Sequence, residues 1–281
     1  MIELGIVFAI LCAATKAIDT LINKSVMQNQ SAINHSFFRI IFVAPVLFIA
    51  SLFHWHFEAG VWWYLIIYGV LEAINIVCHQ QAVKKSNPLH IEIISKSKVL
   101  FAIIVSFVLM IDRLTLWSTL GIIVFVTGTV LAINVQNKND EEKTTAVGVI
   151  LELISVLART FKPFLLKICL QKSLISNETM AFLSMVVAFV VLFVLVRPKL
   201  SFKEISVPKY FAQACIVGIG MLLSGWAIMN ANTIIVNAIE STTVIFIMII
   251  SYFLYKKKYP LLAILGSVIS IIGIVLAIVL S

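Results

Sequence analysis

Ten long apolar stretches, separated by short polar ones, make up most of the 281 residues. Each is close to the ~20 residues that a helix needs to cross the ~30 Å hydrocarbon core of a bilayer. The pattern therefore predicts an all-α membrane protein with ten transmembrane helices. The expected spans are 2–22, 33–53, 61–83, 89–111, 115–134, 146–168, 179–196, 208–230, 234–255 and 259–280.

The two halves of the chain resemble each other. Glycines in the fifth segment recur in the tenth at an offset of 145 residues, Gly121 and Gly128 matching Gly266 and Gly273. An odd number of helices in each copy places the second copy upside down in the membrane, a pattern found in transporters. We therefore expect two inverted five-helix repeats, 1–134 and 146–281, joined by the polar linker 135–145.

Composition supports a membrane protein without a separate soluble domain. The chain is 61% hydrophobic and 12% charged, whereas soluble proteins are ~45–50% apolar and ~25% charged. The start has no early Lys or Arg, so we expect a retained first helix rather than a signal peptide. The four cysteines lie in or beside apolar segments, which favours packing roles over disulfides or metal ligands. We expect no cofactor and no metal.

Charged residues inside the apolar segments are the most informative feature of the sequence. A charge at the bilayer centre costs at least ~2.5–3.5 kcal/mol, so such residues normally face a protein interior or a watery cavity. Leaving His79 aside, six are basic and five acidic. The set is Lys16, Asp19, Arg39, Glu72, His79, Glu92, Lys96, Lys98, Glu152, Arg159, Lys162 and Glu240.

Their helical spacing gathers many of them into polar stripes on five segments, which predicts a bundle around a polar cavity. The candidate substrate-binding residues are Lys16, Asp19, Glu72, Asn75, Glu92, Lys96, Lys98, Glu152, Arg159, Asn237, Glu240 and Ser241. Simpler roles stay open for some charges. Arg39 could reach the membrane interface, His79 could be structural, and Lys16 could pair only with Asp19.

Charges of both signs indicate the kind of ligand. Lys96, Lys98 and Arg159 suit an anionic group, and Glu72, Glu92 and Glu240 suit a cationic one, so we expect a small zwitterionic metabolite such as an amino acid or a derivative. An organophosphate or nucleotide-sugar exchanger is the alternative, and a surplus of basic residues lining the cavity would favour it. Glu240, which has no basic residue on its own segment, is the candidate for proton coupling.

The five-plus-five layout, the paired glycines and the break Asp112-Arg113 after the fourth segment resemble the drug/metabolite transporter superfamily, specifically its EamA-like family. The resemblance covers the whole chain and implies a ten-helix secondary transporter. The chain departs from the family's pattern at Val99, where proline is common, and at Lys257, where an acidic residue is common. These departures and the many intramembrane charges leave the substrate open.

These observations favour a secondary active transporter in the cytoplasmic membrane over an enzyme. The sequence has no His-Glu-x-x-His metalloprotease motif, no nucleophile elbow and no P-loop, so an intramembrane enzyme is only an alternative. The expected partners are a small-molecule substrate and the lipid bilayer, with no nucleic acid, and the expected state is a monomer or homodimer.

The orientation of the chain stays open. The family resemblance implies that both termini lie in the cytoplasm. By contrast, twelve Lys and Arg residues fall in or beside the odd-numbered loops and three in the even-numbered ones, which places the odd-numbered loops in the cytoplasm and the termini outside.

Overall fold

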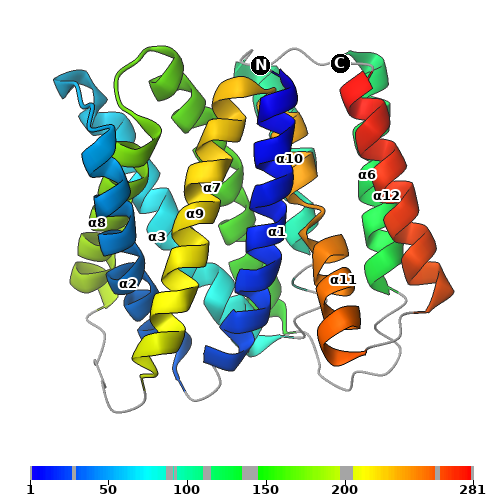
Figure 1. Cartoon of the computed structure of the whole chain (residues 1–281), viewed down its shortest axis with the longest axis horizontal. Coiled ribbons are helices and arrows are strands. Elements are labelled where there is room, and N and C mark those ends of the chain that lie inside the picture. The colour runs from blue at the N-terminus through cyan, green and yellow to red at the C-terminus, as the bar shows by residue number, and fades with distance from the viewer. Residues whose placement is uncertain are drawn as a thin grey trace.

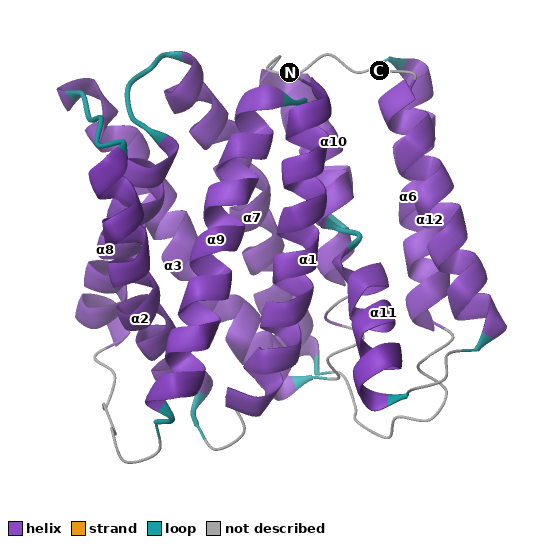
Figure 2. Cartoon of the chain, viewed as in Figure 1, coloured by secondary structure: helices purple, strands orange, loops and turns teal. Residues whose placement is uncertain are grey.

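The computed structural model describes residues 2–26, 30–86, 91, 94–109, 115–134, 145–196, 205–256 and 260–279. These residues form a bundle of helices with no named strand (Figures 1 and 2). The helices are α1 (Ile2–Val26), α2 (Ala32–Phe53), the 3₁₀ helix η1 (Ala59–Val61), α3 (Trp62–Lys85), α5 (Lys98–Leu109), α6 (Leu116–Asn134), α7 (Ala146–Gln171), α8 (Asn177–Val196), α9 (Val207–Asn230), α10 (Thr233–Glu240), α11 (Thr243–Tyr255) and α12 (Leu261–Val279).

The arrangement of apolar and polar surface is that of a membrane protein. Within the described residues, six helical stretches are long and apolar enough to cross a membrane. Large apolar side chains are exposed on the outside, Trp63 by 76% and Leu116 by 81%, while Glu152 and Gln213 are fully buried. Because lipid solvates apolar side chains and not charges, this distribution identifies a protein with several membrane-spanning helices.

Two expected helices are interrupted, which corrects the continuous spans 89–111 and 234–255. The first turns at Ser97, just before α5, and the second turns at Ser241 and Thr242, between α10 and α11. The offset of 145 residues places Ser97 opposite Thr242, so the two breaks occupy equivalent positions in the two halves.

Hydroxyl groups bond to the backbone at both breaks, and neither break contains Gly or Pro. Ser97 Oγ donates to the Ile94 carbonyl oxygen, and Thr242 Oγ1 donates to that of Ile239, both at 2.6 Å. Side chains that bond to nearby backbone carbonyls offer an alternative to the helical pattern.

The glycines that relate the two halves lie at a close contact between α6 and α12, which pack side by side (Figure 1). A Cβ atom on Gly121 would lie 2.8 Å from the Gly273 carbonyl oxygen, and one on Gly128 would lie 2.7 Å from that of Gly266. Only glycine allows the backbones to approach so closely, as in other small-residue contacts of membrane helices.

Two apolar clusters hold the rest of the bundle together. One gathers buried residues of α3, α5, α6, α7 and α10, including Phe125 and Phe164, and the other joins α2 to α3, α8 and α9 around Phe37 and Leu47. Members of both clusters, such as Tyr68 and Ile40, also line the cavity described below.

Candidate functional site: a charged cavity between the halves

A cavity of about 730 Å³ lies inside the bundle. Its walls come from α1, α2, α3, α5, α7, α8, α9, α10 and α11 and from residues beside both helix breaks, and no described residue of α6 or α12 lines it. The size is typical of small-molecule sites, which span ~300–1,000 Å³. It reaches the surface at Lys84 and Lys85, which are exposed at the end of α3.

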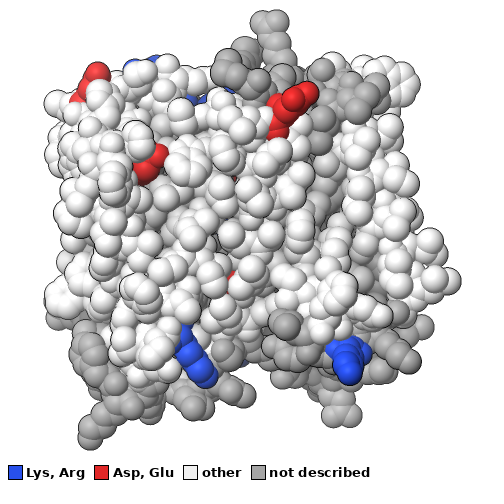
Figure 3. Space-filling view, in the orientation of Figure 1, with Lys and Arg blue, Asp and Glu red and all other residues white. Residues whose placement is uncertain are grey.

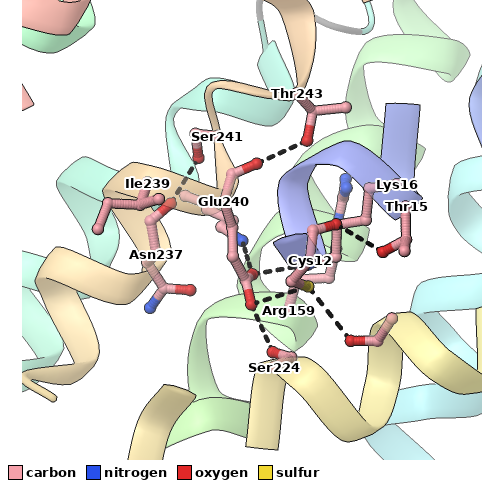
Figure 4. Close-up of polar contacts among 12 residues, drawn as sticks. Cys12, Thr15, Lys16, Arg159, Ser224, Asn237, Ile239, Glu240, Ser241 and Thr243 are labelled. Atoms are coloured by element: carbon pink, nitrogen blue, oxygen red, sulfur yellow. Dashed lines mark hydrogen bonds and ion pairs between the residues drawn. The ribbon is translucent and has the colours of Figure 1, made fainter. Parts of the chain in front are cut away.

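Glu240 is the hub of the polar contacts at the centre (Figure 4). Its Oε2 atom accepts from Lys16 Nζ at 2.6 Å and from Lys98 Nζ at 3.4 Å. Its Oε1 atom accepts from Ser224 Oγ and, at 3.5 Å, from Cys12 Sγ. The side chain is only 4% exposed, so α1, α5, α9 and α10 meet at one buried carboxylate.

The Glu240 cluster lies at the two helix breaks. Glu240 is the last residue of α10 and Lys98 the first of α5, so the ion pair joins the break in one half of the chain to the break in the other. Interrupted helices at the middle of the membrane expose helix ends that can bind charged groups, as in other transporters with discontinuous helices.

A second cluster surrounds Glu152 on α7, which is fully buried. His79 Nδ1 donates to its Oε2 atom at 2.8 Å, and Arg159 forms an ion pair with its Oε1 atom. Arg159 also donates to Ser95 Oγ at 3.1 Å. Glu152 does not itself line the cavity, whereas His79, Arg159 and Ser95 do, so it supports the wall from behind.

A third ion pair joins α3 to α7 across the cavity wall. Lys162 Nζ contacts Glu72 Oε2 and lies 5.1 Å from the centre of the Tyr68 ring. The ring face is electron-rich, so it adds to the stabilisation of the ammonium group.

A fourth pair joins α1 to α2. Arg39 contacts Asp19 Oδ2 at 2.6 Å, and Gln213 Nε2 on α9 donates to Asp19 Oδ1 at 2.9 Å. The structure thus gives partners to Arg39 and Lys16, whose roles the sequence alone had left open. Arg39 pairs with a carboxylate, and Lys16 contacts Glu240 on another helix.

Contacts between α8 and α9 lie near the end of the bundle where α7 leads into α8, in the upper part of Figure 1. Asn177, which lines the cavity, donates to the Leu222 carbonyl oxygen at 2.9 Å, and Trp226 Nε1 donates to Glu178 Oε1 at 3.0 Å. A Cβ atom on Gly225 would lie 1.6 Å from Asn177 Oδ1. A larger residue at position 225 would therefore clash with the Asn177 side chain unless that side chain moved.

The structure brings together most of the candidate residues and separates a few. The cavity is lined by Lys16, Asp19, Glu72, Asn75, Lys96, Lys98, Arg159, Glu240 and Ser241. Glu152 and Asn237 are buried outside its lining, and Glu92 lies outside the described residues. Their role in binding stays a prediction.

Several polar residues of the wall were missed by sequence reasoning. Ser224 contacts Glu240, and Ser95 contacts Arg159. Ser, Gln and Asn are common in membrane helices, so single polar residues carried little signal. The sequence offers two hints of these roles. Ser95 is next to Lys96, and Ser224 lies in the glycine-rich part of α9. Among the described residues, no group of three or more His, Cys, Asp or Glu could hold a metal ion.

Comparison with known proteins agrees with this architecture. The family model described as the EamA-like transporter family matches residues 3–134 and again 146–279. No curated protein matches the chain. A solved structure described only as the crystal structure of a protein has a TM-score of 0.77 and 14% sequence identity, and the similarity covers 100% of this chain and 98% of that one. At this identity the likeness is one of fold.

Proposed function

Because the chain belongs to the EamA-like transporter family, we propose that it is a secondary active transporter that moves a small polar metabolite by alternating access. The observation that carries this proposal is the charged cavity at the two helix breaks. Buried ion pairs stabilise a fold poorly and can often be replaced by apolar packing. A cavity that retains this many charges is better explained by a polar cargo than by stability.

Two further features of the proposal concern the membrane and the repeats. The halves act as inverted copies that rock around the central charges, supported by the equivalent breaks and by the termini, which lie at the same end of the molecule (Figure 1). The protein resides in the cytoplasmic membrane as a monomer or homodimer and catalyses no covalent chemistry. The cargo is a zwitterion or, in the alternative, a phosphorylated anion.

Proton coupling through Glu240 is a separate part of the proposal. Lys16 and Lys98 come to Glu240 from other helices, and both form ion pairs with its carboxylate. A proton would therefore bind Glu240 only after the lysines have moved away or bound another anion. If Glu240→Gln kept the full pH dependence of transport, this role would be refuted.

Counterflow in proteoliposomes tests the proposal. Vesicles are loaded with a mixture of amino acids, phosphate esters and carboxylates, and exchange of each labelled compound is followed by mass spectrometry. We expect exchange of at least one compound by the wild type, and a loss with Glu240→Ala. Exchange no faster than that of empty vesicles for every compound would contradict transport. Lys172→Gln, at an exposed position outside the cavity lining, is the matched control.

A further inference from the structure

The charge of the cavity wall differs from the charge of the segments that form it. The sequence gives six basic and five acidic intramembrane residues, but among the described residues that line the cavity, eight are Lys or Arg and three are Asp or Glu. Three facts account for the difference. Glu152 lies behind the wall, Lys84 and Lys85 join the lining at the opening, and Glu92 lies outside the described residues.

The imbalance is sharpest at the centre. Lys16 and Lys98 share a single oxygen of Glu240, so one carboxylate serves two ammonium groups. The charges that act on Lys98 include the carboxylate of Glu240 and the cations Lys16, Lys96 and Arg159. Like charges held together in a low-dielectric site repel each other unless an anion joins them.

The contacts of Lys98 and Lys16 leave room for such an anion. The Lys98 pair, at 3.4 Å, is longer than the 2.7–2.9 Å typical of a charge-assisted hydrogen bond. The Lys16 side chain is 42% exposed although it contacts Glu240, and both lysines line the cavity. Each ammonium carries three donors, so each can bind an anion while it keeps or gives up Glu240.

From this geometry we propose that the cargo is an anion whose carboxylate or phosphate binds between Lys98, Lys16 and Arg159, and that Glu240 occupies part of this site when the cavity is empty. The inference rests on the proposed transport function and names its substrate class. Glu240 is then a tethered competitor of the cargo: it neutralises the lysines in the empty cavity and yields them when the anion enters. Glu240 on α10 contacts Lys98 on α5, and these two helices belong to different halves of the chain. The exchange of partners therefore also loosens the contact between α5 and α10.

The test is the affinity of the purified protein for four probes, measured by titration calorimetry: succinate, glycerol 3-phosphate, alanine and putrescine. We expect one or both anions to bind and alanine and putrescine not to bind. A response to succinate alone identifies a carboxylate site, and one to glycerol 3-phosphate alone a phosphate site. No binding of either anion overturns the inference, as does binding of alanine or putrescine in preference to both.

Two variants with opposite expected effects separate this role from structural damage. Lys98→Gln removes a cation and should weaken anion binding at least about tenfold, whereas Glu240→Gln removes the competitor and should strengthen it by about tenfold. Lys172→Gln should match the wild type. Should Lys98→Gln fail to fold, Lys16→Gln is the substitute, because its side chain is partly exposed. Weaker anion binding in Glu240→Gln, or unchanged binding in the lysine variant, refutes the site.

Counterflow with the same probes shows whether the anion site or the transport proposal is wrong. Anion binding with the expected variant effects, but without exchange in proteoliposomes, would refute transport and leave the anion site. Exchange of alanine but of neither anion would leave transport intact and refute the anion site.

Discussion

Replacement of Gly128 by alanine should destabilise the protein without affecting the cavity. A Cβ atom at this position would lie 2.5 Å from the Ser270 backbone nitrogen and 2.7 Å from the Gly266 carbonyl oxygen. Both are backbone atoms, so α6 and α12 must move apart to make room. Overpacking of this kind costs ~1–3 kcal/mol. At ~2–4 °C per kcal/mol for chains of 150–250 residues, the melting temperature should fall by about 2–12 °C.

The chain offers both a matched control and a built-in probe for this measurement. Gly60→Ala introduces the same methyl group where nothing lies within 4 Å. Cys12 and Cys169 are free thiols with 0% exposure, so a thiol-reactive dye reports unfolding in detergent. Counterflow per folded molecule should match the wild type, because no described residue of α6 or α12 lines the cavity. A melting temperature equal to that of Gly60→Ala would refute the close-contact reasoning.

Three further predictions concern the cavity and the membrane. Glu72→Gln should lower the free energy of unfolding by ~3–5 kcal/mol, because it leaves Lys162 buried without its carboxylate; an equal stability of Glu72→Gln and wild type in thermal unfolding would contradict this. Gly225→Ala should push Asn177 aside and weaken the contact between α8 and α9, measured as a lower melting temperature than that of Gly60→Ala; equal melting temperatures would argue against a tight contact there. A C-terminal tag should be accessible in intact cells if the loop-charge count sets the orientation, and a protected tag would favour the orientation implied by the family. On the face drawn in Figure 3, basic side chains are prominent at the lower end, away from the termini, and are also visible at the upper edge.

The parts of the fold that the sequence predicted depend on strong local signals. Apolar stretches of membrane-spanning length located the helices, and the recurrence of Gly121 and Gly128 at a fixed offset identified residues that the fold uses for one close contact. Charges in apolar segments pointed to an internal cavity because their cost in lipid is large. Nine of the twelve candidate residues line it.

The remainder depends on contacts between helices that local spacing does not encode. Glu240 has no basic neighbour on its own helix, yet Lys16 and Lys98 reach it from α1 and α5. The balance of charge was counted along segments, while only the fold decides which side chains face the cavity and which, like Glu152, lie behind its wall. The breaks at Ser97 and Thr242 carry neither Gly nor Pro, so the usual signals of an interrupted helix were missing.

If the protein works by the proposed alternating access, the excess of basic residues in the described cavity wall should make it sensitive to voltage. An elementary charge moved across the whole membrane gains or loses ~2.3 kcal/mol per 100 mV. Within the described lining, the cavity carries more positive than negative side chains, and the proposed alternating access would expose these charges first to one side and then to the other. Reorientation of the empty protein should therefore depend on the membrane potential. A bound anion cancels part of that charge, so the loaded protein should respond to the potential more weakly.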